Sequence, residues 1–128
     1  MIVKSFNVAF VGVLAAWSAS ATAHHSIAGE FDGNNVVDVT GTVVELRLIN
    51  PHTYILLDVE NEAGKLERWT LNFGPASKLV RGMGWHNEIL QPGEVVTAQG
   101  RRAREYTGLY LHYLVRDDGE VLLDTLVE

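Results

Sequence analysis

The chain of 128 residues contains no cysteine, which excludes disulfide bridges, cysteine-ligated zinc sites, thiol catalysis and a lipid-modified amino-terminal cysteine. Basic residues are also few, with 10 Lys and Arg against 16 Asp and Glu and a formal net charge of -6. Binding to nucleic acid rests on neutralising phosphates, so this acidic balance disfavours a nucleic-acid partner. Hydrophobic residues make up 47% and charged residues 20%, a composition typical of one globular domain.

The first segment has the layout of a secretory signal peptide. Lys4 precedes an apolar run over residues 6–17, and Ala21-Thr22-Ala23 forms a small-residue cleavage site. The run is shorter than the ~20 residues of a comfortable membrane span, and an uncleaved signal anchor is the alternative. We therefore expect a signal peptide over 1–23 and a single exported domain over 24–128. The expected location is the bacterial periplasm, with full secretion left open and no membrane association after cleavage.

Alternating apolar residues predict a small all-β domain. In the first strand the apolar positions are odd-numbered from 37 to 43 and even-numbered from 44 to 48, which indicates a bulge or sharp coil between them. In the fifth strand the odd-numbered positions are expected to face inward. The predicted strands cover about 37–48, 54–59, 66–73, 94–101, 109–115 and 121–123.

A short helix is expected between the third and fourth strands. Gly74-Pro75 is well placed to open it, because proline is favoured at the first helical position. Its buried stripe would comprise Leu79, Val80 and Met83, and the glycines that follow would end it. Three strands, a helix and then two or three strands is the order of an OB-like Greek-key barrel, with a β-sandwich as the alternative.

Several motifs together resemble a family of small exported bacterial proteins whose common domain has no known function. The resemblance covers nearly all of the chain after residue 23 and implies a periplasmic, OB-like domain with no assigned reaction. The motifs are Ala23-His24-His25-Ser26, Phe31-Asp32, Gly41-Thr42-Val43, Asn50-Pro51-His52, the strand carrying Trp69, Gly84-Trp85 and Pro92-Gly93.

The histidines carry the most distinctive chemistry. Cleavage after Ala23 would give His24 a free α-amino group beside its own imidazole, and these two nitrogens can chelate one metal ion. A third nitrogen would complete a T-shaped site of the kind that Cu(II) favours. Cleavage after Ala21 would instead start the chain at Thr22-Ala23-His24, an amine, two amides and an imidazole in a square-planar Cu(II) or Ni(II) arrangement.

We assign the candidate metal ligands to His24, His25 and His52, of which His52 is the best third ligand because it follows Pro51 at a barrel end. His86, beside Trp85, is expected to be an exposed loop residue, and His112 a residue of the outer sheet surface. Solvated histidines with only adventitious copper binding are the alternative for the amino terminus.

No catalytic signature accompanies these histidines. The paired acids lie in predicted turns, and neither Ser26 nor Ser77 lies in a nucleophile elbow. Arg101, Arg102 and Arg104 form a local basic cluster, expected to be a solvated hairpin.

We therefore expect a non-enzymatic binding module for a Cu(II)-class metal ion. The alternative is a protein- or glycan-interaction module that uses the barrel face and the loop of Trp85, expected to be partly exposed. Trp69 is expected to be buried in the core.

Overall fold

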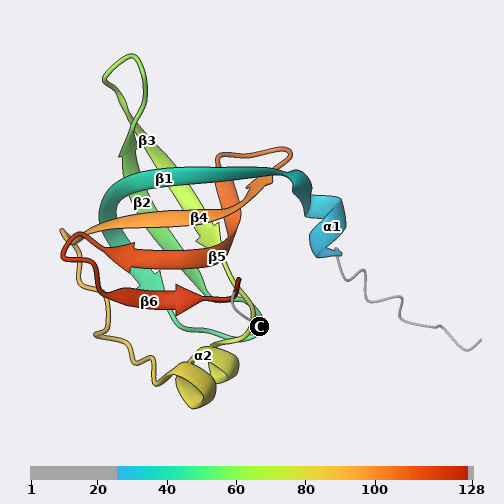
Figure 1. Cartoon of the computed structure of the whole chain (residues 1–128), viewed down its shortest axis with the longest axis vertical. Coiled ribbons are helices and arrows are strands. Elements are labelled where there is room, and N and C mark those ends of the chain that lie inside the picture. The colour runs from blue at the N-terminus through green and yellow to red at the C-terminus, as the bar shows by residue number, and fades with distance from the viewer. Residues whose placement is uncertain (1–25, 127–128) are drawn as a thin grey trace, which may run out of the picture.

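A computed structural model of the protein describes residues 26–126 (Figure 1). The predicted signal segment 1–23, together with His24 and His25, lies outside the described residues. The described part consists of two short helices and six strands. In chain order these are α1 (Ile27–Glu30), β1 (Phe31–Arg47), β2 (Tyr54–Glu60), β3 (Leu66–Asn72), α2 (Ala76–Met83), β4 (Val95–Ala103), β5 (Gly108–Arg116) and β6 (Val121–Asp124).

The strands form one sheet that closes on itself. Its order is β3-β2-β1-β4-β5-β6, all antiparallel, and a further parallel pairing of β3 with β5 completes the ring. β1 is long enough to pair with both β2 and β4, and it curls around the barrel in Figure 1. The predicted all-β, OB-like barrel with one helix between the third and fourth strands is confirmed.

The predicted change of parity in β1 is a β-bulge. Val43 pairs with Leu57 and Glu45 pairs with Leu56, so Val44 is the extra residue. The bulge bends the strand and turns the side chains on its two halves toward the same interior. Val43 is accordingly buried before the bulge, and Leu46 packs against the core after it.

A second bulge lies in β5 and was not predicted. Gln99 pairs with Tyr113 while Gly100 pairs with Leu111, which leaves His112 as the extra residue. Beyond the bulge Leu114 is buried in place of Tyr113, so the expectation of inward odd-numbered positions fails after Leu111. Gly100 permits this geometry, because a Cβ there would lie 2.0 Å from the carbonyl oxygen of Tyr110.

Trp85 closes the α2 end of the barrel. Only 2% of it is exposed, and its indole Nε1 donates a hydrogen bond to the carbonyl of Leu122 at 3.0 Å. The expectation that Trp85 would be partly exposed is therefore wrong. The left-handed Gly84, whose N–H bonds back to Leu79, ends α2 and directs the next residue into the core. A buried tryptophan with a satisfied N–H stabilises the fold through both area and packing.

Trp69 is less buried than expected. It packs against the edge of the core but remains half-buried, and the guanidinium of Arg102 lies 4.5 Å from its ring centroid. Its Nε1 is shielded from solvent with no hydrogen-bond partner among residues 26–126. One side of the Trp69 ring is therefore covered by a cation rather than by apolar side chains.

The outer face of α2 also differs from the expected buried stripe. Ala76 and Leu79 are buried, whereas Val80 and Met83 are 46% and 39% exposed. The helix has only 8 residues and lies against the barrel along one narrow side. Part of its apolar stripe consequently faces outward.

The two tryptophans generate a direct comparison of core contributions. Trp85→Ala removes a fully buried ring and should lower the free energy of unfolding by about 3–5 kcal/mol. Trp69→Ala should cost less, because the ring is half-buried and no hydrogen bond is lost. Chemical denaturation of both variants beside the parent measures the difference. If Trp69→Ala lowers the free energy of unfolding more than Trp85→Ala does, the burial assigned to the two rings is incorrect.

Candidate functional site

The structure separates the three described histidines. His52 is exposed in the loop between β1 and β2, His86 is exposed in the loop after α2, and His112 is half-buried in β5. His24 and His25 lie outside the described residues. Within residues 26–126, no group of three or more His, Cys, Asp or Glu side chains is arranged to hold a metal ion.

The described chain begins with a fixed feature next to His25. The hydroxyl of Ser26 caps α1 by accepting a hydrogen bond from the N–H of Gly29 at 3.1 Å. At the other end of α1, the carbonyl of Glu30 accepts the N–H of Arg104 from the loop after β4 at 3.0 Å. Phe31 is then buried as β1 begins. The residue after the two histidines is thus attached to the barrel through a short, hydrogen-bonded segment.

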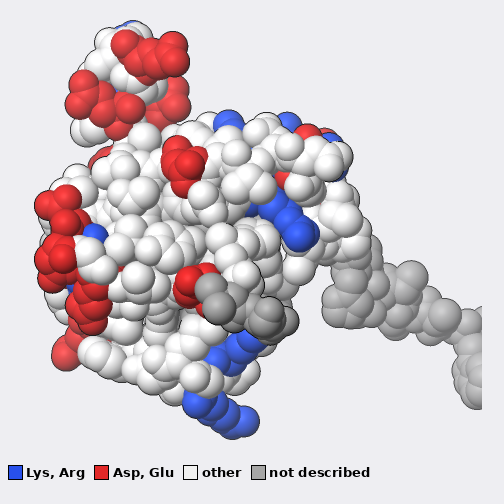
Figure 2. All heavy atoms as spheres, viewed as in Figure 1, with Lys and Arg blue, Asp and Glu red and all other residues white. Residues whose placement is uncertain are grey.

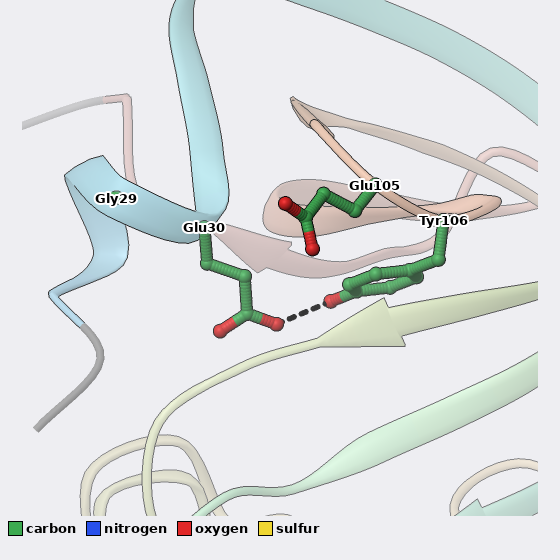
Figure 3. Close-up of a pocket in the computed structure, with 4 residues that line it drawn as sticks. All are labelled: Gly29, Glu30, Glu105 and Tyr106. Carbon is green, nitrogen blue, oxygen red and sulfur yellow. Dashed lines mark hydrogen bonds between the residues drawn. The ribbon is translucent and has the colours of Figure 1, made fainter. Parts of the chain in front are cut away.

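A pocket of about 380 Å³ lies between α1 and the loop joining β4 to β5, lined by Gly29, Glu30, Glu105 and Tyr106 (Figure 3). The carboxylates of Glu30 and Glu105 and the phenol of Tyr106 point into the same space in this view. In the described part of the chain neither carboxylate forms an ion pair. The pocket therefore has a negative lining, which attracts cations.

Tyr106 links the two sides of this pocket. Its hydroxyl donates to Glu30 Oε1 at 2.6 Å and accepts from Asn72 Nδ2 at 3.0 Å, so α1 is tied through the phenol to β3. Burial and the hydrogen bond to the Glu30 carboxylate raise the pKa of Tyr106, and the donor from Asn72 opposes this shift. The phenol consequently stays protonated and keeps its donor aimed at Glu30.

Four aromatic side chains, Phe31, Phe73, Tyr106 and Tyr110, form an aromatic row that leads from α1 toward the loop of His52. Phe31 contacts Tyr106 at 6.2 Å and Tyr110 at 5.5 Å between ring centroids, and Tyr110 stacks on Phe73 at 6.0 Å. Desolvation by burial raises the pKa of Tyr110. The row places α1 and the end of β3 on one side of the barrel.

The backbone beside His52 joins the far end of the aromatic row. Thr53 is buried, donates its N–H to the carbonyl of Gly74 and accepts the N–H of Phe73, both at 2.9 Å. His52 is therefore an exposed side chain next to a rigidly bonded residue. Phe73, which is bonded to Thr53, stacks on Tyr110, and Tyr110 contacts Phe31 at the start of β1.

His112 occupies the β5 bulge rather than an open sheet surface. Its ring meets Tyr110 edge-on at 6.0 Å, and its Nε2 is shielded from solvent with no partner within residues 26–126. Desolvation, with a smaller contribution from the charge of Arg101, lowers the pKa of His112. Its backbone carbonyl accepts two hydrogen bonds from Thr125, which ties the chain after β6 to the bulge.

The predicted basic cluster is distributed among separate contacts. Arg102 donates to the carbonyls of Tyr106 and Gly108 at 2.6 and 3.0 Å while it stacks on Trp69. Arg104 lies 3.7 Å from Asp32. Sequence reasoning missed the residues that do gather at this end of the barrel: Glu30, Glu105, Tyr106 and Tyr110. No spacing in the chain marked them, since α1 and the β4–β5 loop meet only in the folded barrel.

The helices between residues 26 and 126 include none with the length and apolar character that a bilayer crossing requires. The comparisons with known proteins point to one family. The model of a family of unknown function, DUF6152, matches residues 12–110, and the chain belongs to this family. No curated protein matches the chain significantly.

The hydrogen bonds of Tyr106 generate a prediction about α1. Tyr106→Phe keeps the ring but removes both bonds, and should lower the free energy of unfolding by about 0.5–1 kcal/mol because the phenol is partly exposed. Hydrogen exchange should quicken at the Arg104 amide, which is bonded to Glu30. Tyr113→Phe is the control, since its hydroxyl has no hydrogen-bond partner in the described chain. Unchanged exchange at Arg104 would show that the phenol does not hold α1.

The lowered pKa of His112 generates a prediction about pH. The unfolded chain takes up the proton near the ordinary pKa of about 6.5, whereas the folded chain resists it, so stability falls as the pH drops below about 6.5. The loss levels off once the pH is below the folded pKa. His112→Phe keeps a ring beside Tyr110 but cannot titrate, so its stability should depend less on pH over that window. Unfolding free energies measured across the window test this, and parallel pH profiles for the two proteins would contradict it.

Proposed function

We propose that the protein is an exported binding module that holds a Cu(II)-class metal ion at its mature amino terminus. The predicted cleavage site after Ala23 would leave His24 as the first residue, with its α-amine and imidazole as a single-residue chelate. The observation that supports the proposal is the hydrogen-bonded cap of α1 at Ser26, two positions after His24. The cap supports this site because it attaches the ligands of His24 to rigid backbone.

The reach of the chain is compatible with this arrangement. Only His25 separates His24 from Ser26, and a span of two extended residues is at most about 7 Å. The α-amine is therefore confined to the neighbourhood of α1, whatever path residues 24 and 25 take. A confined amine raises the effective concentration of the ligand at the barrel surface and lowers the entropy lost on binding.

The remaining ligand is best supplied by His52. Nitrogen donors in a planar arrangement favour Cu(II), and His52 offers an exposed imidazole next to the buried Thr53. The pocket carboxylates of Glu30 and Glu105 are not proposed as metal ligands. They provide a negative environment that attracts the cation, and they can accept hydrogen bonds from the ring N–H of a ligating histidine.

The absence of cysteine fits this proposal in the periplasm. A site built from amine and imidazole nitrogens contains no thiolate that could be oxidised in an oxidising compartment. The described barrel is held by packing, hydrogen bonds and ion pairs, and without cysteine in the chain export imposes no disulfide chemistry on its folding.

A Cu(II) titration of the exported protein, in a competing chelator, tests the proposal. Affinity should rise steeply from about pH 5 to 8, because the imidazole and the α-amine must both lose protons to bind. His24→Ala should abolish the tight site. One extra residue in front of His24 should do the same without changing the fold, because it removes the amine from the chelate. His52→Ala should weaken binding less, and His86→Ala should leave it unchanged as a matched exposed histidine.

Equal affinity of the extended and the mature protein would show that the amine is not a ligand, and the metal proposal would fall. The alternative, a protein- or glycan-interaction module, would then take its place. In that case the buried Trp85 contributes no contact surface, and the exposed face must be sought elsewhere on the barrel.

A further inference from the structure

Strands β1, β4, β5 and β6 turn one side into the barrel and the other side away from it. The register aligns one inward row across all four strands, which is buried and consists of Val39, Ala98, Leu114 and Leu123. The adjacent row consists of Thr40, Thr97, Val115 and Val121. Because successive side chains of a strand point to opposite faces, this second row lies on the outside of the sheet.

We term the outer surface of these strands the open face, defined by Thr40, Thr42, Val95, Thr97, Val115 and Val121. Val95 and Val121 are 39% and 49% exposed on it. The four strands face the viewer in Figure 1, and from the same direction Figure 2 shows mostly uncharged atoms over them. Asp and Glu atoms gather instead on the projecting hairpin between β2 and β3 and along one edge. Depletion of charge is typical of the centre of a protein interface.

Polar side chains on and beside the open face are hydrogen-bonded to one another. The hydroxyls of Thr40 and Thr97 lie 2.8 Å apart, and in the next row Gln99 Nε2 donates to Asp38 at 3.0 Å. Polar groups that are already paired lose fewer hydrogen bonds when a partner displaces water from them. This pairing favours a protein surface over a sugar, which would need free donors and acceptors.

Two opposite charges at the border of the open face indicate what can cover it. Arg101 lies on β4 and Asp124 on β6, and neither forms an ion pair within residues 26–126. Each follows a buried residue of its strand, Gly100 or Leu123, and therefore points outward. A two-fold axis between the two positions sets Arg101 of each copy against Asp124 of the other, the reciprocal contact of an isologous interface.

We propose that the open face associates with the open face of a second copy, which gives a symmetric dimer. Elsewhere the formal charge of -6 makes two copies repel, whereas an uncharged surface lets them approach. Four strands spaced ~4.8 Å apart, over seven residues that rise ~3.4 Å each, provide at most about 450 Å² per copy. A standard interface buries about 800 Å² per partner, so the dimer is weak and reversible.

Sedimentation equilibrium from about 10 μM to about 1 mM, the range in which weak complexes dissociate, tests the proposal. The average mass should rise from monomer toward dimer with concentration. A metal chelator in the buffer excludes association through a bridging Cu(II) ion. His24→Ala should associate as the parent does, because the open face contains none of the proposed metal ligands. A parent that stays monomeric at every concentration overturns the proposal, whatever else binds to the open face.

Charge reversal tests whether the partner is a second copy in the proposed arrangement. By symmetry, Arg101→Asp removes two attractions from each dimer and adds two repulsions. Each exposed pair changes the association constant about twofold, so the four changes should weaken association about 15-fold. Asp124→Arg should have a similar effect. The double variant Arg101→Asp/Asp124→Arg keeps the net charge of the parent and restores both pairs, so it should dimerise like the parent.

A second comparison tests the uncharged part of the open face. Val121→Glu places a charge on it and should weaken association. Leu66→Glu places the same charge at the tip of the β2–β3 hairpin, where Leu66 is 69% exposed, and should leave association unchanged. All variants should melt near the parent, because the substituted side chains point outward. Equal association of the two glutamate variants overturns the proposal, and so does a folded double reversal that fails to regain dimerisation.

Discussion

Closure of the barrel depends on the approach of β5 to β3 at Gly108. A Cβ at this position would lie 2.6 Å from the carbonyl oxygen of Thr70 and 2.5 Å from the ring of Tyr106, so only glycine fits between them. The parallel ladder that forms there joins the two ends of the sheet and brings the β4–β5 loop beside β3. The bond from Asn72 to Tyr106, the attachment of α1 and the pocket all follow from this contact.

Much of the barrel was predictable because apolar and polar residues alternate along most strands. In β1 the apolar residues switch from odd-numbered to even-numbered positions, which indicates the bulge. The bulge in β5 was not predictable in this way. The run Tyr113-Leu114-Val115 is apolar throughout, so the sequence does not show which of these residues faces inward. The displacement at His112 accompanies the close approach of Gly100 on the neighbouring strand. Trp85 was misjudged for a related reason. Trp85 follows two glycines, a pattern that indicates a flexible, exposed loop. The space in the core that its indole fills is formed only when the sheet is assembled.

The candidate site was only partly predictable. The histidines of the amino terminus and His52 stand out in the sequence, because free amine and imidazole nitrogens are recognisable without a structure. Glu30 and Glu105 are ordinary acids in the sequence, and they share a pocket only because α1 and the β4–β5 loop are hydrogen-bonded together. The metal assignment therefore rests on sequence chemistry, while the structure supplies the environment that makes it testable.

The sixth strand has a consequence for behaviour at high concentration. Within the described chain β6 pairs only with β5, covers just Val121–Asp124 and is interrupted by an extra residue at Leu122. An open strand edge is a template for strand addition by another molecule, and short, irregular edges are poor templates. The short, irregular edge of β6 is therefore expected to protect the protein against edge-to-edge polymerisation at high concentration.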